Sequence, residues 1–80
     1  MMTIAQQVRD TITTKCPGTF SLYAGYGMEG AEPVRFPTGH MLREKRNENG
    51  RCVMAVYQYA DDSKLTYRYK SDGGYTLEAA

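Results

Sequence analysis

Apolar residues recur at every fourth position near the start of the chain, which is the spacing of one face of an α-helix. This stripe consists of Ile4, Val8 and Ile12. Thr3 stands in front of it and Gln6 follows three positions later, the spacing of a capping box, in which two side chains bond free backbone N–H groups at a helix start. Pro17 cannot continue a helix. The pattern therefore predicts a helix that begins after Thr3 and stops before Pro17-Gly18.

A second pattern, with a period of two, begins at Thr19. The apolar residues Phe20, Leu22 and Ala24 alternate with Ser21 and Tyr23. This alternation predicts a strand over Thr19–Ala24. Residues 25–40 are rich in Gly and Pro and show no period, so we expect a long loop with a short strand around Val34–Phe36. Loops of this length in compact domains are often functional.

In the second half of the chain, alternating stretches are separated by three turn sequences, which is the pattern of a β-meander. The strongest is Asn49-Gly50, a dipeptide typical of a two-residue type I′ turn, which would pair Glu48 with Arg51. The other two turns are expected at Asp61–Lys64 and at Ser71–Gly73, whose glycine suits a left-handed bulge position.

These turns sort the strand side chains into two faces, because successive residues of a strand point to opposite sides of a sheet. The predicted inward face, under the helix, consists of Cys52, Met54, Val56, Leu65, Tyr67, Tyr69, Tyr75 and Leu77. The predicted outward face consists of Glu44, Arg46, Val53, Ala55, Tyr57, Tyr59, Arg68 and Lys70. A change of one residue in the register would exchange the two faces.

Together these elements predict an α+β fold, in which one N-terminal helix packs on a four- to five-stranded antiparallel sheet arranged as a β-meander. A chain of 80 residues closes only one small core, so residues 1–80 are expected to form a single domain. The chain is 41% hydrophobic and 24% charged, which is typical of a globular protein. Its seven tyrosines suit half-buried sheet faces and binding surfaces alike.

The formal net charge is only +1, from ten Lys and Arg residues against nine Asp and Glu residues. A dedicated duplex-DNA binder usually carries a strong basic excess, so the overall charge does not favour that class. The N-terminus lacks the apolar segment of a signal peptide, and no stretch approaches membrane-spanning length. Cys16 and Cys52 fit neither a disulfide framework nor a paired metal motif. We therefore expect a cytoplasmic protein with two buried free thiols and no membrane contact.

The stretch Gly25-Tyr26-Gly27-Met28-Glu29-Gly30 matches the G-x-G-x-x-G pattern of phosphate-binding loops. Such a loop requires a helix that opens at its third glycine and points its N-terminus at the phosphate. Pro33 prevents a helix there, and Glu29 would repel an anion. The glycines therefore indicate tight turns, and we expect Tyr26 and Met28 to be exposed and able to contact a partner.

The remaining candidates for chemistry favour structural roles. His40 is the only histidine, and its spacing from either cysteine is not that of a local zinc motif. Asp61 and Asp62 would point to opposite faces of a strand, and before a serine they are typical of a turn. The sequence therefore predicts a non-enzymatic protein without cofactor or metal.

Two functional hypotheses follow. The first is a small protein-binding module, an inhibitor or adaptor that docks on a larger protein or protein complex, because Tyr and Arg are enriched at interface hot spots. Such compact domains are common among accessory proteins of phages and mobile elements, including anti-CRISPR proteins, with which this chain shares size and style only. Its predicted contact residues are Tyr26, Met28, Glu29, Arg46, Tyr57, Tyr59, Arg68 and Lys70.

The alternative hypothesis is a protein that binds single-stranded nucleic acid or RNA. Aromatic and cationic side chains on one sheet face stack with bases and neutralise the phosphate backbone. The stretch KLTYRYK alternates these two residue types, and the predicted platform consists of Arg46, Tyr57, Tyr59, Arg68 and Lys70. A homodimer formed through an edge strand is compatible with both hypotheses.

Overall fold

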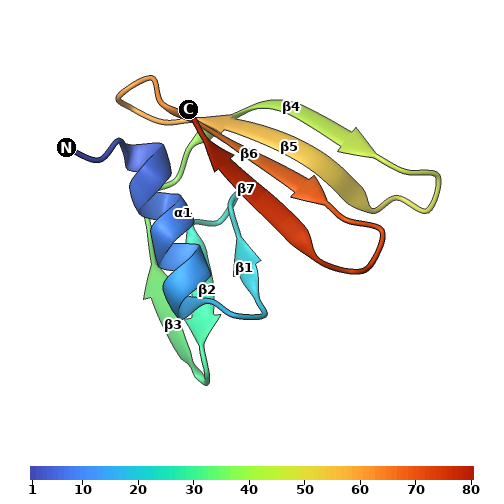
Figure 1. Cartoon of the computed structure of the whole chain (residues 1–80), viewed down its shortest axis with the longest axis horizontal. Coiled ribbons are helices and arrows are strands. Elements are labelled where there is room, and N and C mark those ends of the chain that lie inside the picture. The colour runs from blue at the N-terminus through green and yellow to red at the C-terminus, as the bar shows by residue number, and fades with distance from the viewer.

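The computed structural model describes residues 1–80 and contains one helix and seven strands in two antiparallel sheets (Figure 1). Helix α1 spans Ile4–Lys15. The smaller sheet has the order β1-β2-β3, formed by Phe20–Ser21, Tyr26–Glu29 and Glu32–Arg35. The larger sheet is a meander of β4, β5, β6 and β7, which span His40–Arg46, Cys52–Gln58, Lys64–Tyr69 and Tyr75–Ala79. The α+β class is confirmed, whereas the single sheet of the prediction is wrong because the chain forms two.

The start of α1 has the predicted capping box and a second cap from far along the chain. Gln6 N donates to Thr3 Oγ1 at 3.1 Å, and Thr3 N donates to Gln6 Oε1 at 2.9 Å. The turn between β5 and β6 supplies two further acceptors: Ile4 N donates to Asp61 Oδ2 at 2.9 Å, and Ala5 N donates to Ser63 Oγ at 3.0 Å. Side chains thus accept hydrogen bonds from the first free N–H groups of the helix. Asp61 lies in a turn, as predicted, and its hydrogen bond to Ile4 N also joins α1 to the larger sheet.

Asp61→Asn is expected to lower the melting temperature at neutral pH by several degrees. The Asp61 carboxylate accepts hydrogen bonds from Ser63 and from Ile4 N, which lower its pKa below the ordinary value of 3.8. A group whose pKa is lowered by folding stabilises the protein above its ordinary pKa and loses that effect as the pH falls. The difference between wild type and variant should therefore shrink in acid, which thermal melts followed by circular dichroism at neutral and acid pH will show.

Asp62→Asn is the matched control, because Asp62 is exposed and no side-chain hydrogen bond involves it. The control should melt at the wild-type temperature. A loss of stability in Asp61→Asn that stayed the same at every pH would contradict the role assigned to the carboxylate charge.

The segment predicted as a long loop, residues 25–40, contains the hairpin of β2 and β3. Its turn is Gly30-Ala31, between the paired residues Glu29 and Glu32. Gly30 has a φ of +62° while Ala31 keeps a negative φ, which is the requirement of a type II′ turn. Pro33 is tolerated because β3 is an edge strand. The alternation was too short to detect, since each strand has only four residues.

The predicted strand Thr19–Ala24 is shorter than expected, because β1 ends at Ser21. There the backbone turns: Gly25 N donates to Ser21 O at 2.9 Å, and Ala24 N donates to Ser21 Oγ at 3.1 Å. Tyr23, within this turn, is 77% exposed.

The three hairpins of the larger sheet share one loop geometry. Each has a loop of three residues. The backbone N–H of the residue before the loop donates to the carbonyl of the residue after it, and the carbonyl of the residue before the loop accepts from the N–H of the third loop residue. The residues before and after the three loops are Asn47 and Arg51, Tyr59 and Ser63, and Lys70 and Gly74. The third loop residue is left-handed each time: Gly50 at +79°, Asp62 at +68° and Gly73 at +95°. This is a type I turn followed by a bulge. The left-handed Gly73 is confirmed, whereas the two-residue turn at Asn49-Gly50 is wrong.

The loop between β5 and β6 decides which side of β5 faces inward. In place of the predicted four-residue turn, the three-residue loop sets Tyr57 opposite Leu65 and Ala55 opposite Tyr67. Residues directly opposite each other share a face of a sheet, so Ala55 and Tyr57 join Leu65 on the inward face. The predicted faces are therefore right for β6 and β7 and exchanged for Met54, Val56, Ala55, Tyr57 and Tyr59. They are also wrong for Glu44 and Arg46 of β4, which were predicted to face outward but lie opposite Ala55 and Cys52 on the inward side.

This exchange corrects two predicted contact residues. Tyr57 and Tyr59 were expected to be exposed, but only 6% and 4% of their surfaces are accessible. Arg68 and Lys70 are exposed on the other side of the sheet, as predicted. Cys52 faces inward as predicted and is half-buried, while Cys16 is fully buried, and both thiols are free.

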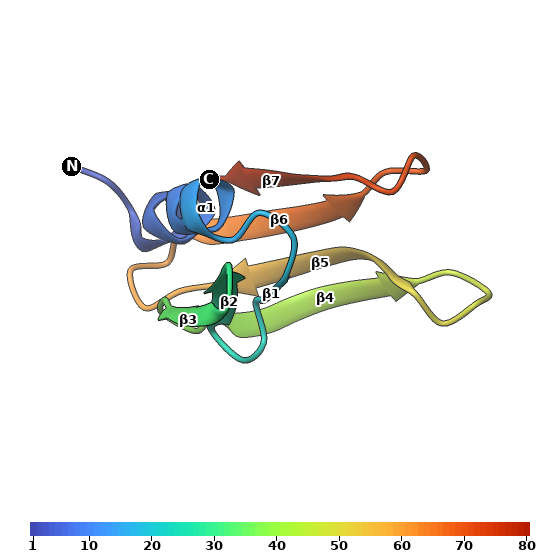
Figure 2. The same ribbon diagram turned by 90° about the horizontal axis from the view of Figure 1, so that it is seen from below.

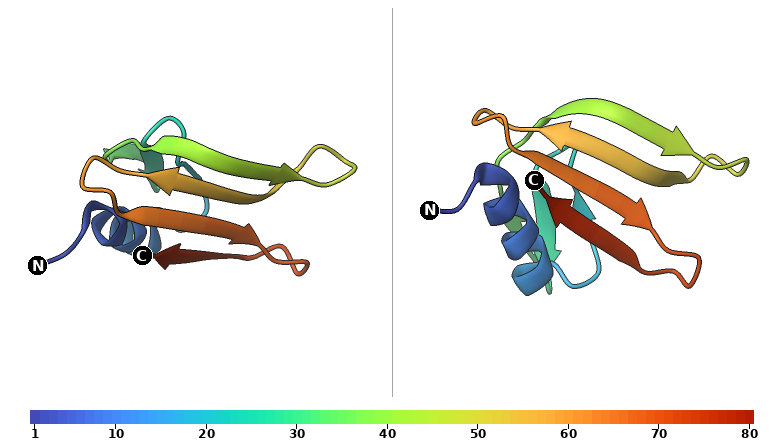
Figure 3. Two further views of the ribbon diagram at one scale, coloured as in Figure 1. Left: turned by 90° about the horizontal axis from the view of Figure 1, so that it is seen from above. Right: turned by 45° about the horizontal axis from the view of Figure 1, so that its top comes forward.

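Helix α1 and the smaller sheet lie side by side over one end of the larger sheet (Figure 2). The core between them consists of Ala5, Val8, Ile12, Cys16, Leu22, Phe36, Ala55, Tyr57, Tyr59 and Leu65. The β4–β5 and β6–β7 hairpins project beyond this cover, while no helix or strand lies over the outward face (Figures 2 and 3). The only helix is too short and too polar to cross a membrane.

Candidate functional site

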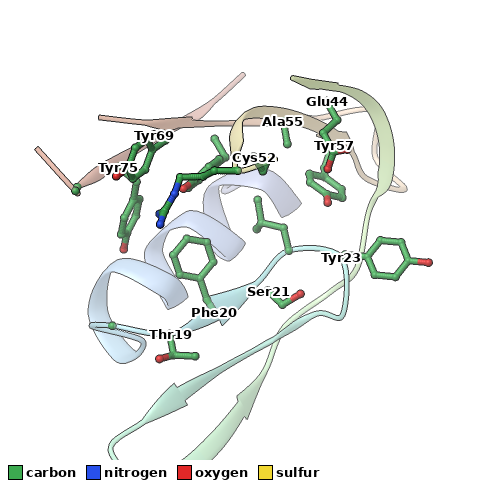
Figure 4. Close-up of a pocket in the computed structure, with 16 residues that line it drawn as sticks. Thr19, Phe20, Ser21, Tyr23, Glu44, Cys52, Ala55, Tyr57, Tyr69 and Tyr75 are labelled. Atoms are coloured by element: carbon green, nitrogen blue, oxygen red, sulfur yellow. The ribbon is translucent and has the colours of Figure 1, made fainter. Parts of the chain in front are cut away.

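A groove of about 470 Å³ opens where β1 faces the inward side of the larger sheet (Figure 4). In this view Ala55 and Cys52 lie along the sheet, Phe20 and Ser21 come from β1, Tyr69 and Tyr75 stand on one side, and Glu44 and Tyr57 on the other. The volume falls within the range of ligand pockets, about 300–1,000 Å³. Because most of the large side chains in its lining are rings, we call it the aromatic groove.

One wall of the aromatic groove is a cluster of three rings. The ring centroid of Phe20 lies 5.0 Å from that of Tyr75 and 6.1 Å from that of Tyr67, and the two tyrosine rings stack at 6.1 Å. Burial raises the pKa of both tyrosines above the ordinary value of 10.0. Their hydroxyls can donate or accept hydrogen bonds. The wall thus offers a flat apolar surface with polar tips.

The groove has one charged side chain without an ion-pair partner. The Arg51 guanidinium lies 4.9 Å from the ring centroid of Tyr69, a cation–π contact. Across the groove, Glu44 accepts from Arg46 Nε at 3.0 Å, and Arg46 also donates to Gly50 O at 2.7 Å. Arg46 neutralises the charge of Glu44, so the positive charge of Arg51 is the one charge in the groove that is not balanced.

Cys52 supplies a thiol to the groove lining, but the histidine of the chain lies elsewhere. His40 is the first residue of β4, opposite Gln58. The Sγ of Cys52 contacts the carbonyl of Met54 at 3.6 Å. The groove therefore combines aromatic surface, hydroxyl groups and one free cation, which are the components of a binding surface.

Three predicted contact residues lie on the smaller sheet, away from the groove. Tyr26 is 37% exposed, with the guanidinium of Arg35 5.8 Å from its ring centroid. Glu29 is exposed as well. Met28 was expected to be exposed in a loop, but it is half-buried because it lies in β2, opposite Pro33 of β3. The G-x-G-x-x-G stretch forms β2 and its turn at Gly30, and a strand rather than a helix follows it.

The other five predicted contact residues are divided between the two faces of the larger sheet. Tyr57 lines the buried side of the aromatic groove, Tyr59 lies in the core, and Arg46 is held by Glu44 at the groove rim. Arg68 and Lys70 point to the outward face. Of the predicted single-strand platform, Arg68 and Lys70 thus lie on the side of the sheet opposite Tyr57, while Arg46 lies on the inward side and is paired with Glu44. The structure therefore does not bring the five residues together on one face.

No protein-family model, no curated protein and no solved structure matches this chain.

Sequence reasoning missed Phe20 and Arg51 as members of one site with Tyr67 and Tyr75. The inward direction of both tyrosines was predicted, but their partial exposure was not. Both tyrosines are partly exposed because the larger sheet is longer than α1 and the smaller sheet, which cover only part of its inward face. The alternation of side chains along a strand does not reveal how far the covering elements extend.

Proposed function

We propose that this protein is a small non-enzymatic binding module, an inhibitor or adaptor that docks on a larger protein. The observation that supports this proposal is the aromatic groove, an open space of about 470 Å³ lined by rings and by Arg51. Tyr and Arg are the residue types that most often dominate binding energy, because they bury a large area and still make polar contacts.

The groove best fits an extended segment of the partner that carries an apolar side chain and a nearby carboxylate. The apolar side chain would pack on Phe20 and Tyr75, whose rings form a preformed wall. The carboxylate would pair with Arg51, which has no acidic partner within the chain and is held in place over Tyr69. A guanidinium that is already positioned binds a carboxylate with little loss of side-chain entropy.

A pair of double variants tests this proposal. Arg51→Glu with Tyr69→Ala breaks the cation–π pair of the groove, and Arg35→Glu with Tyr26→Ala breaks the corresponding pair on the smaller sheet. Both variants change the same residue types in the same way. Tagged wild type and both variants are used to capture proteins from nuclease-treated bacterial lysate, and a retained protein is then purified for affinity measurement.

We expect the groove variant to bind the purified partner about tenfold or more weakly, as loss of a hot-spot residue does, and the control to bind like wild type. Loss of binding in the control alone would place the docking surface on the smaller sheet at Tyr26, Met28 and Glu29. Failure of the wild type to retain any protein from the lysate would contradict the proposal.

A further inference from the structure

The outward face of the larger sheet carries five of the ten cations of the protein and only one of its nine carboxylates. Alternation along the strands places Arg43, Lys45, Lys64, Arg68, Lys70 and Glu78 on it. All six are exposed, and none of the five cations is in an ion pair. We call this surface the basic face. Its charge of +4, five cations less one carboxylate, exceeds the +1 of the whole chain, so the rest of the protein is negative and composition alone conceals the face.

The cations of the basic face form two rows. The first row, Arg43 and Lys45, lies along β4. The second row, Lys64, Arg68 and Lys70, lies along β6 and its end, and β5 separates the two rows. Since neighbouring strands are about 4.8 Å apart and alternate residues about 6.8 Å apart, the rows lie about 10 Å from each other. Arg43 and Lys45, and likewise Arg68 and Lys70, are about 7 Å apart, whereas Thr66 separates Lys64 from Arg68 by about 14 Å. Met54 lies between the rows and is only 9% exposed although no element covers it. Lys45 and Arg68 lie directly opposite Met54 on the two neighbouring strands, a position in which their apolar stems can cover it, so Met54 adds little apolar surface.

We propose that the basic face binds the phosphate backbone of double-stranded nucleic acid, with one row of cations directed at each strand. A spacing of about 10 Å between rows, extended by long side chains, suits phosphates on the two sides of a groove of about 6–12 Å. This site lies on the side of the sheet opposite the aromatic groove and goes beyond the docking function proposed above. Contacts to phosphates alone read no sequence, so binding should be sequence-independent.

Two features of the face favour a duplex over other acidic partners. The centres of protein interfaces are poor in Lys and rich in apolar or aromatic area, whereas this face presents three lysines and little apolar surface. Single strands are held largely by base stacking on aromatic rings. All tyrosines of β5, β6 and β7 point inward or lie in the core, so the basic face has no ring on which a base can stack.

The test measures binding of the full chain to a labelled DNA duplex, an RNA duplex of the same sequence and the matching single strand, between about 50 and 200 mM salt. We expect duplex dissociation constants of about 1–100 µM, and a decline of log affinity with log salt of slope about −3 to −5, which is roughly 0.9 per phosphate contacted. The comparison of the DNA and RNA duplexes shows which of the two the face binds more tightly.

Two variants of equal net charge locate the site. Arg68→Glu with Lys70→Glu and the control Lys15→Glu with Arg35→Glu each replace two cations by two carboxylates, taking the formal charge from +1 to −3. The first should weaken duplex binding more than tenfold, and the control less than about twofold at moderate salt, where distant charges are screened. The milder Arg68→Gln with Lys70→Gln should reduce the salt slope by about 2, one for each phosphate contact.

Absence of duplex binding by wild type at the lowest salt, equal losses in the two charge-reversal variants, or binding of the single strand alone would each overturn the proposal. The groove variant, Arg51→Glu with Tyr69→Ala, is measured in parallel and should keep duplex binding within about threefold, because it changes the other face of the sheet and a more distant charge. Duplex binding and protein docking can therefore fail independently of each other.

Discussion

Gly27→Ala is expected to lower the free energy of unfolding by about 3 kcal/mol, a cost at the upper end of that of overpacking a core. A Cβ atom at Gly27 would overlap Sγ of Cys16 and lie 2.9 Å from the carbonyl oxygen of Thr19. Cys16 is fully buried at the end of α1, so its side chain cannot move into solvent. Denaturant unfolding of both proteins measures the difference.

Gly18→Ala is the control, because a Cβ at Gly18 meets no atom within 4 Å. Its stability should stay within about 0.5 kcal/mol of wild type, as for ordinary surface substitutions. In a Cys16→Ala background, Gly27→Ala should cost about 1 kcal/mol less, since the overlapping sulfur is gone and neighbouring substitutions couple. Strict additivity of the two substitutions would show that the contact with the sulfur is not the source of the cost.

Tyr59→Phe is expected to stabilise the protein by about 1–2 kcal/mol at neutral pH, because an unpaired buried hydroxyl carries a desolvation cost of this order. The Tyr59 hydroxyl is buried and has no hydrogen-bond partner. The phenyl ring would keep the packing of the tyrosine ring in the core. Thermal or denaturant unfolding measures the gain, and a loss of stability would show that the hydroxyl has a partner after all.

The same residue sets part of the alkaline limit of stability. Burial raises the pKa of Tyr59 from 10.0 to about 12. Because the folded pKa lies above the unfolded one, this contribution is fully present below pH 10 and is lost as the pH rises through about 12. Two pKa units correspond to about 2–3 kcal/mol.

Tyr59→Phe should therefore lose about 2–3 kcal/mol less than wild type between pH 10 and 12. Tyr23→Phe, at a ring that is 77% exposed, should behave like wild type. Unfolding curves across this pH range, with tyrosinate absorbance to follow ionisation, test both. An unchanged alkaline slope in Tyr59→Phe would contradict the assignment.

The elements that could be predicted from the sequence are those whose causes are local. The stripe and the capping box of α1 involve residues at most four positions apart, and both are present as predicted. The faces of β5 depended instead on a loop of three rather than four residues. That loop places Asp62, a non-glycine residue, at positive φ. Aspartate is enriched at positive φ, but it is a weaker signal than glycine because it is also common in ordinary turns. One residue was enough to move Tyr57 and Tyr59 from the surface to the core.

The two candidate surfaces were hidden for a different reason. The aromatic groove exists because the larger sheet extends past α1 and the smaller sheet, and this extension is a property of the assembled layers. The basic face exists because the register of β4, β5 and β6 directs the cations of β4 and β6 to the same side of the sheet. Most of the compensating carboxylates lie elsewhere on the protein. The net charge of +1 sums over both and so reports neither.

The cap that Asp61 and Ser63 place on α1 also bears on the order in which the protein folds. These residues follow their partners Ile4 and Ala5 by 57 and 58 positions. A 12-residue helix is marginal in water by itself. During synthesis α1 leaves the ribosome before the larger sheet, but we expect it to be completed only after the turn between β5 and β6 has formed and closed a long loop. The rate of folding should follow the formation of that turn rather than the helical tendency of the N-terminus.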